Sequence, residues 1–157
     1  MGSCPLAAGW LGWRRVMAAN TAPLLVAWDG SGPAQRAFDY ALDLARLRAQ
    51  PLRVISVIEL PEVYGGVGMG EVDPQRIADM RQTLMKLSAT AKAAGVECSG
   101  EVLLGAPAEL LIDALRSSNA AALVMGHTEK NLLMRWLLGS VSRTVLDEAK
   151  VPVTLVP

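Results

Sequence analysis

The sequence has few of the residues that build metal sites, disulfide frameworks and catalytic dyads. Its 157 residues include one histidine and two cysteines, Cys4 and Cys98, which lie in no CxxC or metal-ligand spacing. A histidine-based zinc site and a disulfide-stabilised fold are therefore not expected. The two cysteines fit a reducing compartment, so we expect a cytoplasmic protein.

An excess of charge of one sign is also missing. Basic and acidic residues balance at 15 each, which gives no reason to expect a nucleic-acid partner or an acidic membrane surface. The hydrophobic fraction reaches 52%, yet no apolar run approaches the ~20 residues that a transmembrane helix needs. The sequence therefore predicts a soluble protein with neither nucleic acid nor membrane as a partner.

The first 21 residues differ from the rest of the chain. Their apolar stretch has no positive charge before it and two arginines after it, which is a poor fit to a secretory signal peptide. Because Met17 begins a natural start for the domain that follows, we expect residues 1–21 to be a disordered N-terminal extension or a misassigned start. The alternative is an interaction tail in which Trp10 and Trp13, one helical turn apart, contact a partner protein.

Short apolar runs alternate with amphipathic segments over residues 22–157, a length that fits one domain. Strands are expected at 24–28, 52–58, 97–103, 121–125 and 151–156, and helices at 34–49, 74–94, 108–117 and 140–148. Continuously apolar strands separated by helices predict a parallel sheet with helices on both faces. This is a doubly wound α/β fold, in which ligands bind outside the carboxyl ends of the strands where the strand order reverses.

The stretch from residue 123 to the end carries the most functional information. It reads as a buried strand, a glycine-bounded loop, a helix that opens at Gly139 and Ser140, and a closing strand. The bare N–H groups of a first helical turn attract anions, and glycine lets the backbone approach closely. With Ser140 expected as the N-cap, the sequence predicts a phosphate site at this helix.

Gly126, Gly139 and Ser140 resemble the C-terminal signature of the universal stress protein family, Gly-x2-Gly-x9-Gly-Ser, which surrounds the phosphates of a bound ATP. The second glycine position of this signature is Glu129. A carboxylate ~4 Å from one phosphate charge costs up to about 4 kcal/mol at an effective dielectric constant near 20, although solvent and Mg²⁺ reduce this cost. The resemblance therefore comes with a change that opposes triphosphate binding.

The resemblance extends over residues 23–157. The segment LLVAWDGSGPAQRAFDYALDLA is similar to the family's opening strand, Asp-x-Ser turn and first helix, with Asp29 and Ser31 at the motif positions. The resemblance implies a Rossmann-like five-stranded parallel sheet of order 3-2-1-4-5, which brings Asp29 and Gly126 together. It also implies a homodimer that pairs through the final strand, from Val151 to Val156. An apolar edge strand is safe from uncontrolled pairing inside a closed two-fold dimer.

The resemblance implies nucleotide-binding positions at Ala27, Asp29, Ser31, Val57, Gly126, His127, Glu129, Gly139, Ser140 and Val141. Some of these have a plain structural alternative. Asp29 either contacts the ribose or accepts backbone N–H bonds in the turn and caps the next helix. His127 either adds charge near a phosphate or is a solvated loop residue.

Enzymatic chemistry has the least support, because no nucleophile–base pair, carboxylate dyad or metal cluster is visible in the sequence. No catalytic residue and no metal ligand is therefore expected. We expect a stress-response protein that acts by binding, on an unknown protein partner, with a degenerate adenine-nucleotide pocket. The alternative is a sensor that binds ATP with Mg²⁺, AMP or a cyclic nucleotide through the preserved part of the motif.

Overall fold

The computed structural model describes residues 22–60, 72–127 and 139–157. The predictions on Trp10, Trp13, Glu129 and the N-terminal extension lie outside these residues. The described strands are β1 (Leu24–Ala27), β2 (Leu52–Ile58), β3 (Cys98–Leu104), β4 (Ala122–Gly126) and β5 (Val153–Val156). The described helices are α2 (Gly32–Arg48), α3 (Pro74–Ala93), α4 (Pro107–Ser117) and α5 (Ser140–Glu148).

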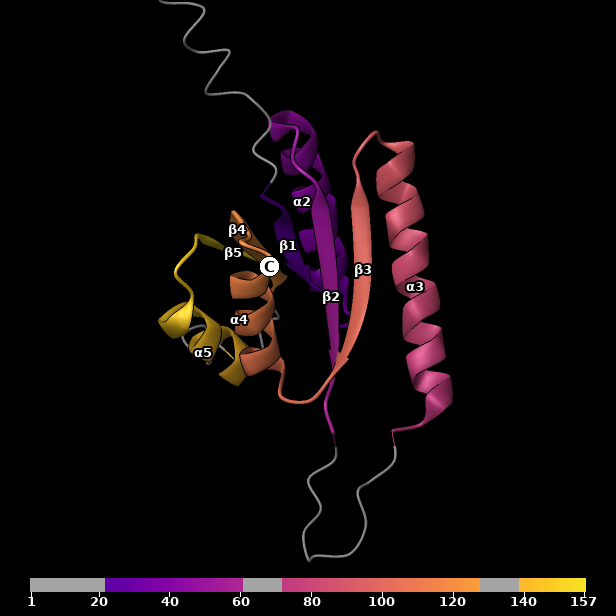
Figure 1. The fold of residues 1–157 in the computed structure, drawn as a ribbon, viewed down its shortest axis with the longest axis vertical. Helices are drawn as coiled ribbons and strands as arrows, with labels where there is room; N and C mark the ends of the chain where they lie inside the picture. The colour runs from indigo at the N-terminus through magenta and orange to yellow at the C-terminus, as the bar shows by residue number, and fades with distance from the viewer. Residues whose placement is uncertain (1–21, 61–71, 128–138) are drawn as a thin grey trace, which may run out of the picture.

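The five strands form one parallel sheet in the order β3-β2-β1-β4-β5, which confirms the predicted fold class. Two hydrophobic cores lie on opposite faces of this sheet. Side chains of α2 and α3 pack into the first core, and side chains of α4 and α5 pack into the second. Figure 1 shows α3 alongside β3 at one edge, and α4 and α5 together near β4 and β5. The strand order reverses between β1 and β4.

Local chemistry explains where the elements begin. Helix α2 starts two residues before the predicted boundary because Ser31 caps it, with its Oγ accepting the N–H of Ala34 at 3.2 Å, and because a proline occupies its first turn. Strand β5 starts at Val153, later than the predicted Val151. Proline at position 152 has no N–H to donate to the ladder, and strand pairing begins after it.

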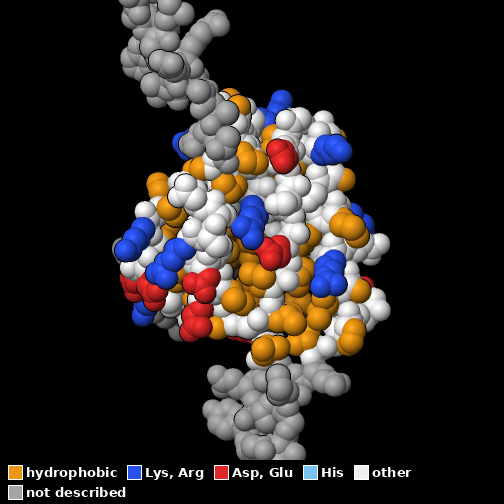
Figure 2. All heavy atoms as spheres, in the orientation of Figure 1, with side chains coloured by type: hydrophobic (Ala, Val, Ile, Leu, Met, Phe, Trp, Pro, Cys, Tyr) orange, Lys and Arg blue, Asp and Glu red, His pale blue; other side chains and the backbone are white. Residues whose placement is uncertain are grey.

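None of the helices within the described ranges is both long enough and apolar enough to cross a bilayer. On the face shown in Figure 2, basic and acidic side chains are interspersed, so no large field of one sign develops there. An ion pair between Arg53 of β2 and Glu101 of β3, at 2.6 Å, belongs to this mixed pattern.

Candidate functional site

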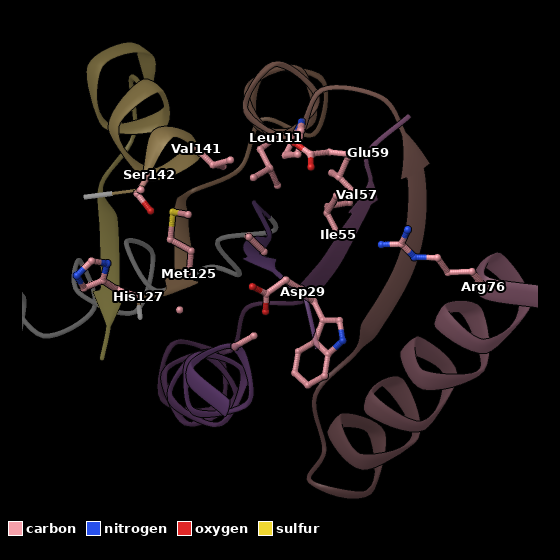
Figure 3. Close-up of a pocket in the computed structure, with 16 residues that line it drawn as sticks. Asp29, Ile55, Val57, Glu59, Arg76, Leu111, Met125, His127, Val141 and Ser142 are labelled. Carbon is pink, nitrogen blue, oxygen red and sulfur yellow. The ribbon is translucent and has the colours of Figure 1, made fainter. Parts of the chain in front are cut away.

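A cavity of about 410 Å³ lies at the carboxyl edge of the sheet, where β1 and β4 diverge. We call it the carboxyl-edge cavity. The ends of β1, β2 and β4 contribute to its wall, together with residues near the starts of α2, α3, α4 and α5. Figure 3 shows Asp29, Val57, Met125 and Val141 reaching it from four different elements. The cavity is at the position where doubly wound folds bind ligands.

Seven of the ten predicted site residues line this cavity. They come from the ends of β1, β2 and β4 and from the start of α5: Ala27, Asp29, Val57, Gly126, His127, Gly139 and Val141. Ser31 and Ser140 are not among the lining residues, and Glu129 lies outside the described residues. The topology thus brings together Asp29 and Gly126, which are almost one hundred residues apart in the sequence.

Asp29 stabilises the turn after β1, which is the structural role predicted for it. Its Oδ1 accepts the backbone N–H of Ser31 at 2.9 Å, and Gly30 between them has a φ of 82°. The predicted capping of the next helix belongs to Ser31 instead, because the hydroxyl of Ser31 reaches the N–H of Ala34. Asp29 is exposed and lines the cavity, so its carboxylate also faces the space where a ligand would lie.

Gly126 at the end of β4 packs against the backbone of the first turn of α2. A Cβ built at Gly126 would lie 2.5 Å from the carbonyl carbon of Pro33 and 2.5 Å from the amide nitrogen of Ala34. Main-chain atoms at these distances cannot move aside as a flexible side chain would. The glycine is therefore required by the packing of the protein itself, whether or not a ligand also approaches it.

Helix α5 begins at Ser140, with Gly139 as its N-cap and no side-chain hydrogen bond to the cap. The prediction that Ser140 is the N-cap is wrong by one residue. Glycine is acceptable at the N-cap, and it has no side chain with which to accept the first-turn N–H groups, for which the described residues show no other side-chain acceptor. No described atom lies within 4 Å of a Cβ built at Gly139. Unlike Gly126, Gly139 meets no packing constraint from the described residues.

Ser142 is a cavity residue that the sequence analysis did not identify. Its side chain is only 7% exposed, and in Figure 3 it lies in the cavity beside Met125. The hydroxyl is polar, small and close to the first turn of α5, which suits it to donate to an anion held there. Amphipathic periodicity could have placed Ser142 on the buried face of α5, because Val145, one turn later, is fully buried.

Only some of the remaining lining residues could be predicted from the sequence. Ile55 and Glu59 lie two residues on either side of Val57, so strand alternation places them on the same face. The other lining residues depend on how separate elements approach one another: Trp28, Ala34, Arg76, Pro107, Leu111 and Met125. No pattern along the sequence indicated that α3 or α4 would reach this cavity.

The cavity has a polar end and an apolar middle. The polar end is formed at the first turn of α5, by Gly139, Ser142 and the nearby Gly126. The apolar wall is formed by four side chains: Ile55, Val57, Leu111 and Met125. This arrangement can hold an anion at one end and a flat apolar ring beside it.

Within the described ranges no three His, Cys, Asp or Glu residues come together as a metal site. Cys98 lies in β3, and burial raises the pKa of its thiol.

The same fold occurs in known proteins. A family model described as "Universal stress protein family" matches residues 21–157. A universal stress protein of Methanocaldococcus jannaschii is 29% identical over 136 residues, which are 85% of this chain and 80% of that protein. A universal stress protein of Archaeoglobus fulgidus superposes with a TM-score of 0.72 at 25% identity, covering 87% of this chain and 98% of the other.

A second structure is described as the universal stress protein from Archaeoglobus fulgidus in complex with dAMP. It superposes with a TM-score of 0.66 at 27% identity and covers 88% of this chain and all of the other. The match of the family model extends over almost the whole of the described domain. This chain belongs to the universal stress protein family.

Proposed function

We propose that this protein acts in a stress response by binding an adenine nucleotide in the carboxyl-edge cavity, without turning it over. The observation that carries the proposal is that one cavity is lined both by the first turn of α5, where no described side chain caps the helix, and by apolar residues at the end of β2. An uncapped helix N-terminus attracts a phosphate, and the slot accepts a base. The relative from Archaeoglobus fulgidus that was solved with dAMP supports this class of ligand.

Each part of the nucleotide has a matching group in the cavity. The 5′-phosphate lies at the first turn of α5, where Gly139 allows close approach and Ser142 donates a hydrogen bond. The ribose lies near Asp29, whose carboxylate can accept from a hydroxyl. The base occupies the slot between Val57 and Leu111.

The sequence favours a ligand with one phosphate over a ligand with three. Glu129 stands at the glycine position of the phosphate-binding signature, and its negative charge opposes each additional phosphate. The same observation favours the second candidate function, an adaptor that binds a protein partner and has an impaired nucleotide pocket. The two candidates differ in whether purified protein binds a nucleotide.

The first prediction concerns Ser142. Isothermal titration calorimetry with AMP should detect binding to the wild type, and Ser142→Ala should weaken it about tenfold. A hydrogen bond to a charged group contributes about 1.5–3 kcal/mol, and every 1.4 kcal/mol is tenfold in affinity. Thr144→Ala is the matched control, because Thr144 lies on the same helix, its hydroxyl bonds the helix's own Ser140 carbonyl, and it does not line the cavity. An absence of binding by wild type to AMP, ATP and cyclic AMP would favour the adaptor.

The second prediction concerns assembly. Strand β5 is at the edge of the sheet, and the N–H groups of Leu123 in β4 and of His127 just after it donate to the carbonyls of residues 152 and 156. By alternation, the N–H and C=O groups of Val153 and Leu155 then point to the outer edge. We propose that two chains pair antiparallel along this edge. Light scattering at micromolar concentration should give twice the chain mass of 16.7 kDa, whereas a monomer there would rule out a stable dimer.

A further inference from the structure

Arg76 reaches the carboxyl-edge cavity from a position that helix stability does not explain. It lies in the first turn of α3, three residues after the N-cap Asp73, and this turn contains no acidic residue. A cation is disfavoured there because the helix N-terminus carries partial positive charge. Arg76 is exposed and lines the cavity, and the ion pair found among the described residues joins Arg53 and Glu101 instead.

Trp28 also lines this cavity, with its indole N–H buried and not facing the open space. Its side chain is only 7% exposed, and its Nε1 is buried without a hydrogen-bond acceptor among the described residues. The ring itself is well packed, with its centroid 6.4 Å from that of Phe38 in an edge-to-face arrangement. Buried N–H groups nearly always have a partner, so this one calls for an acceptor that the described chain does not provide. An indole and a guanidinium can only donate.

The Arg76 guanidinium lies on a different side of the cavity from the first turn of α5. Figure 3 shows the Arg76 guanidinium extending from α3 on one side of the cavity, with His127 and Ser142 on the opposite side and Asp29 between them. The cavity wall also contains two carboxylates, those of Asp29 and Glu59, which lie away from the Arg76 guanidinium in Figure 3. Glu59 follows β2 and lines the cavity, and the carboxylate of Asp29 accepts the N–H of Ser31. The cavity thus has donors on two sides, with the carboxylate of Asp29 between them.

We propose that the ligand is a nucleoside 5′-phosphate that carries a second phosphate on its ribose, and that Arg76 binds this second phosphate. The inference rests on the proposed function, because the 5′-phosphate occupies the α5 end and the ribose lies at Asp29. A phosphate on the 2′ or 3′ oxygen is then directed toward Arg76, whose planar fork of donors matches phosphate oxygens. The remaining ribose hydroxyl is left for Asp29.

The test compares AMP with adenosine 2′,5′-bisphosphate and adenosine 3′,5′-bisphosphate by calorimetry. With wild-type protein, at least one bisphosphate should bind about tenfold to a hundredfold more tightly than AMP, as expected for a hydrogen-bonded charge pair. Arg76→Gln should remove this advantage, so that AMP and the two bisphosphates bind with similar affinities. Arg81→Gln is the matched control, because Arg81 is exposed on the same helix and lines a different groove, next to Gly100. It should keep the full advantage.

A second variant separates hydrogen bonding from bulk charge. Arg76→Lys keeps the positive charge and loses the planar fork of donors, so it should keep only part of the bisphosphate advantage. Equal affinity of wild type for AMP and both bisphosphates would overturn the inference and leave the proposed function standing. An advantage that survives in Arg76→Gln would overturn it as well. If none of the three nucleotides binds, the inference and the proposed function fail together.

Discussion

Gly126→Ala is expected to lower the free energy of unfolding by about 3 kcal/mol, the upper part of the usual range for overpacking a well-packed site. The added methyl would meet the carbonyl carbon of Pro33 and the amide nitrogen of Ala34 at 2.5 Å. Relief requires that α2 move away from β4, which disturbs a helix whose inner face is fully buried at Ala37, Phe38 and Ala41. Urea denaturation followed by circular dichroism measures the change.

Gly139→Ala is the control variant for Gly126→Ala. The two glycines belong to the same signature, yet Gly139 has a φ of −57° and no described atom lies within 4 Å of its built Cβ. Its replacement should change the free energy of unfolding by less than about 1 kcal/mol, the usual effect at an N-cap. Similar losses of stability in the two variants would contradict the assignment of a packing role to Gly126 alone.

Glu129→Gly is expected to raise the affinity for ATP by at least about tenfold. The substitution removes a negative charge whose repulsion of one phosphate charge at ~4 Å is worth up to about 4 kcal/mol at an effective dielectric constant near 20. It also restores a residue that adopts positive φ readily, and 1.4 kcal/mol suffices for a tenfold change. The affinity for AMP should rise less, because AMP brings fewer charges to the loop. Calorimetry with both nucleotides in the presence of Mg²⁺ measures the difference.

Glu129→Gln distinguishes the two causes. Glutamine keeps the size and the backbone preference of the original residue and loses the charge. A rise in ATP affinity in both variants identifies the charge as the obstacle, whereas a rise in the glycine variant alone identifies the backbone. If neither variant binds ATP better than wild type does, the single carboxylate is not the cause, and the cavity as a whole is unsuited to a triphosphate.

The sequence predicted the fold well because its signals are local. The boundaries of β2 and α5 agree with the structure to the residue, and the strand order follows from the resemblance to the family. The prediction of the helix cap was wrong by one residue because Gly139 and Ser140 are both acceptable N-caps. The sequence does not show which of the two is the first residue with helical backbone angles.

The candidate site was less predictable, for a different physical reason. Gly126, Gly139 and Asp29 are marked by motif spacing, whereas Arg76 and Trp28 become cavity residues only when separate βα units pack together. In the sequence, Arg76 is one of several arginines on an amphipathic helix, and Trp28 is the end of an apolar strand. Their shared environment is a tertiary property, which no spacing rule contains.

The contact between Gly126 and the first turn of α2 also bears on how the protein folds. It joins residues more than ninety positions apart, so the floor of the cavity closes only after the first and fourth strands have met. A partly folded chain that lacks this contact has no complete pocket. A nucleotide bound as proposed would therefore recognise only the fully folded domain, and by mass action it would stabilise the native state without guiding the chain toward it.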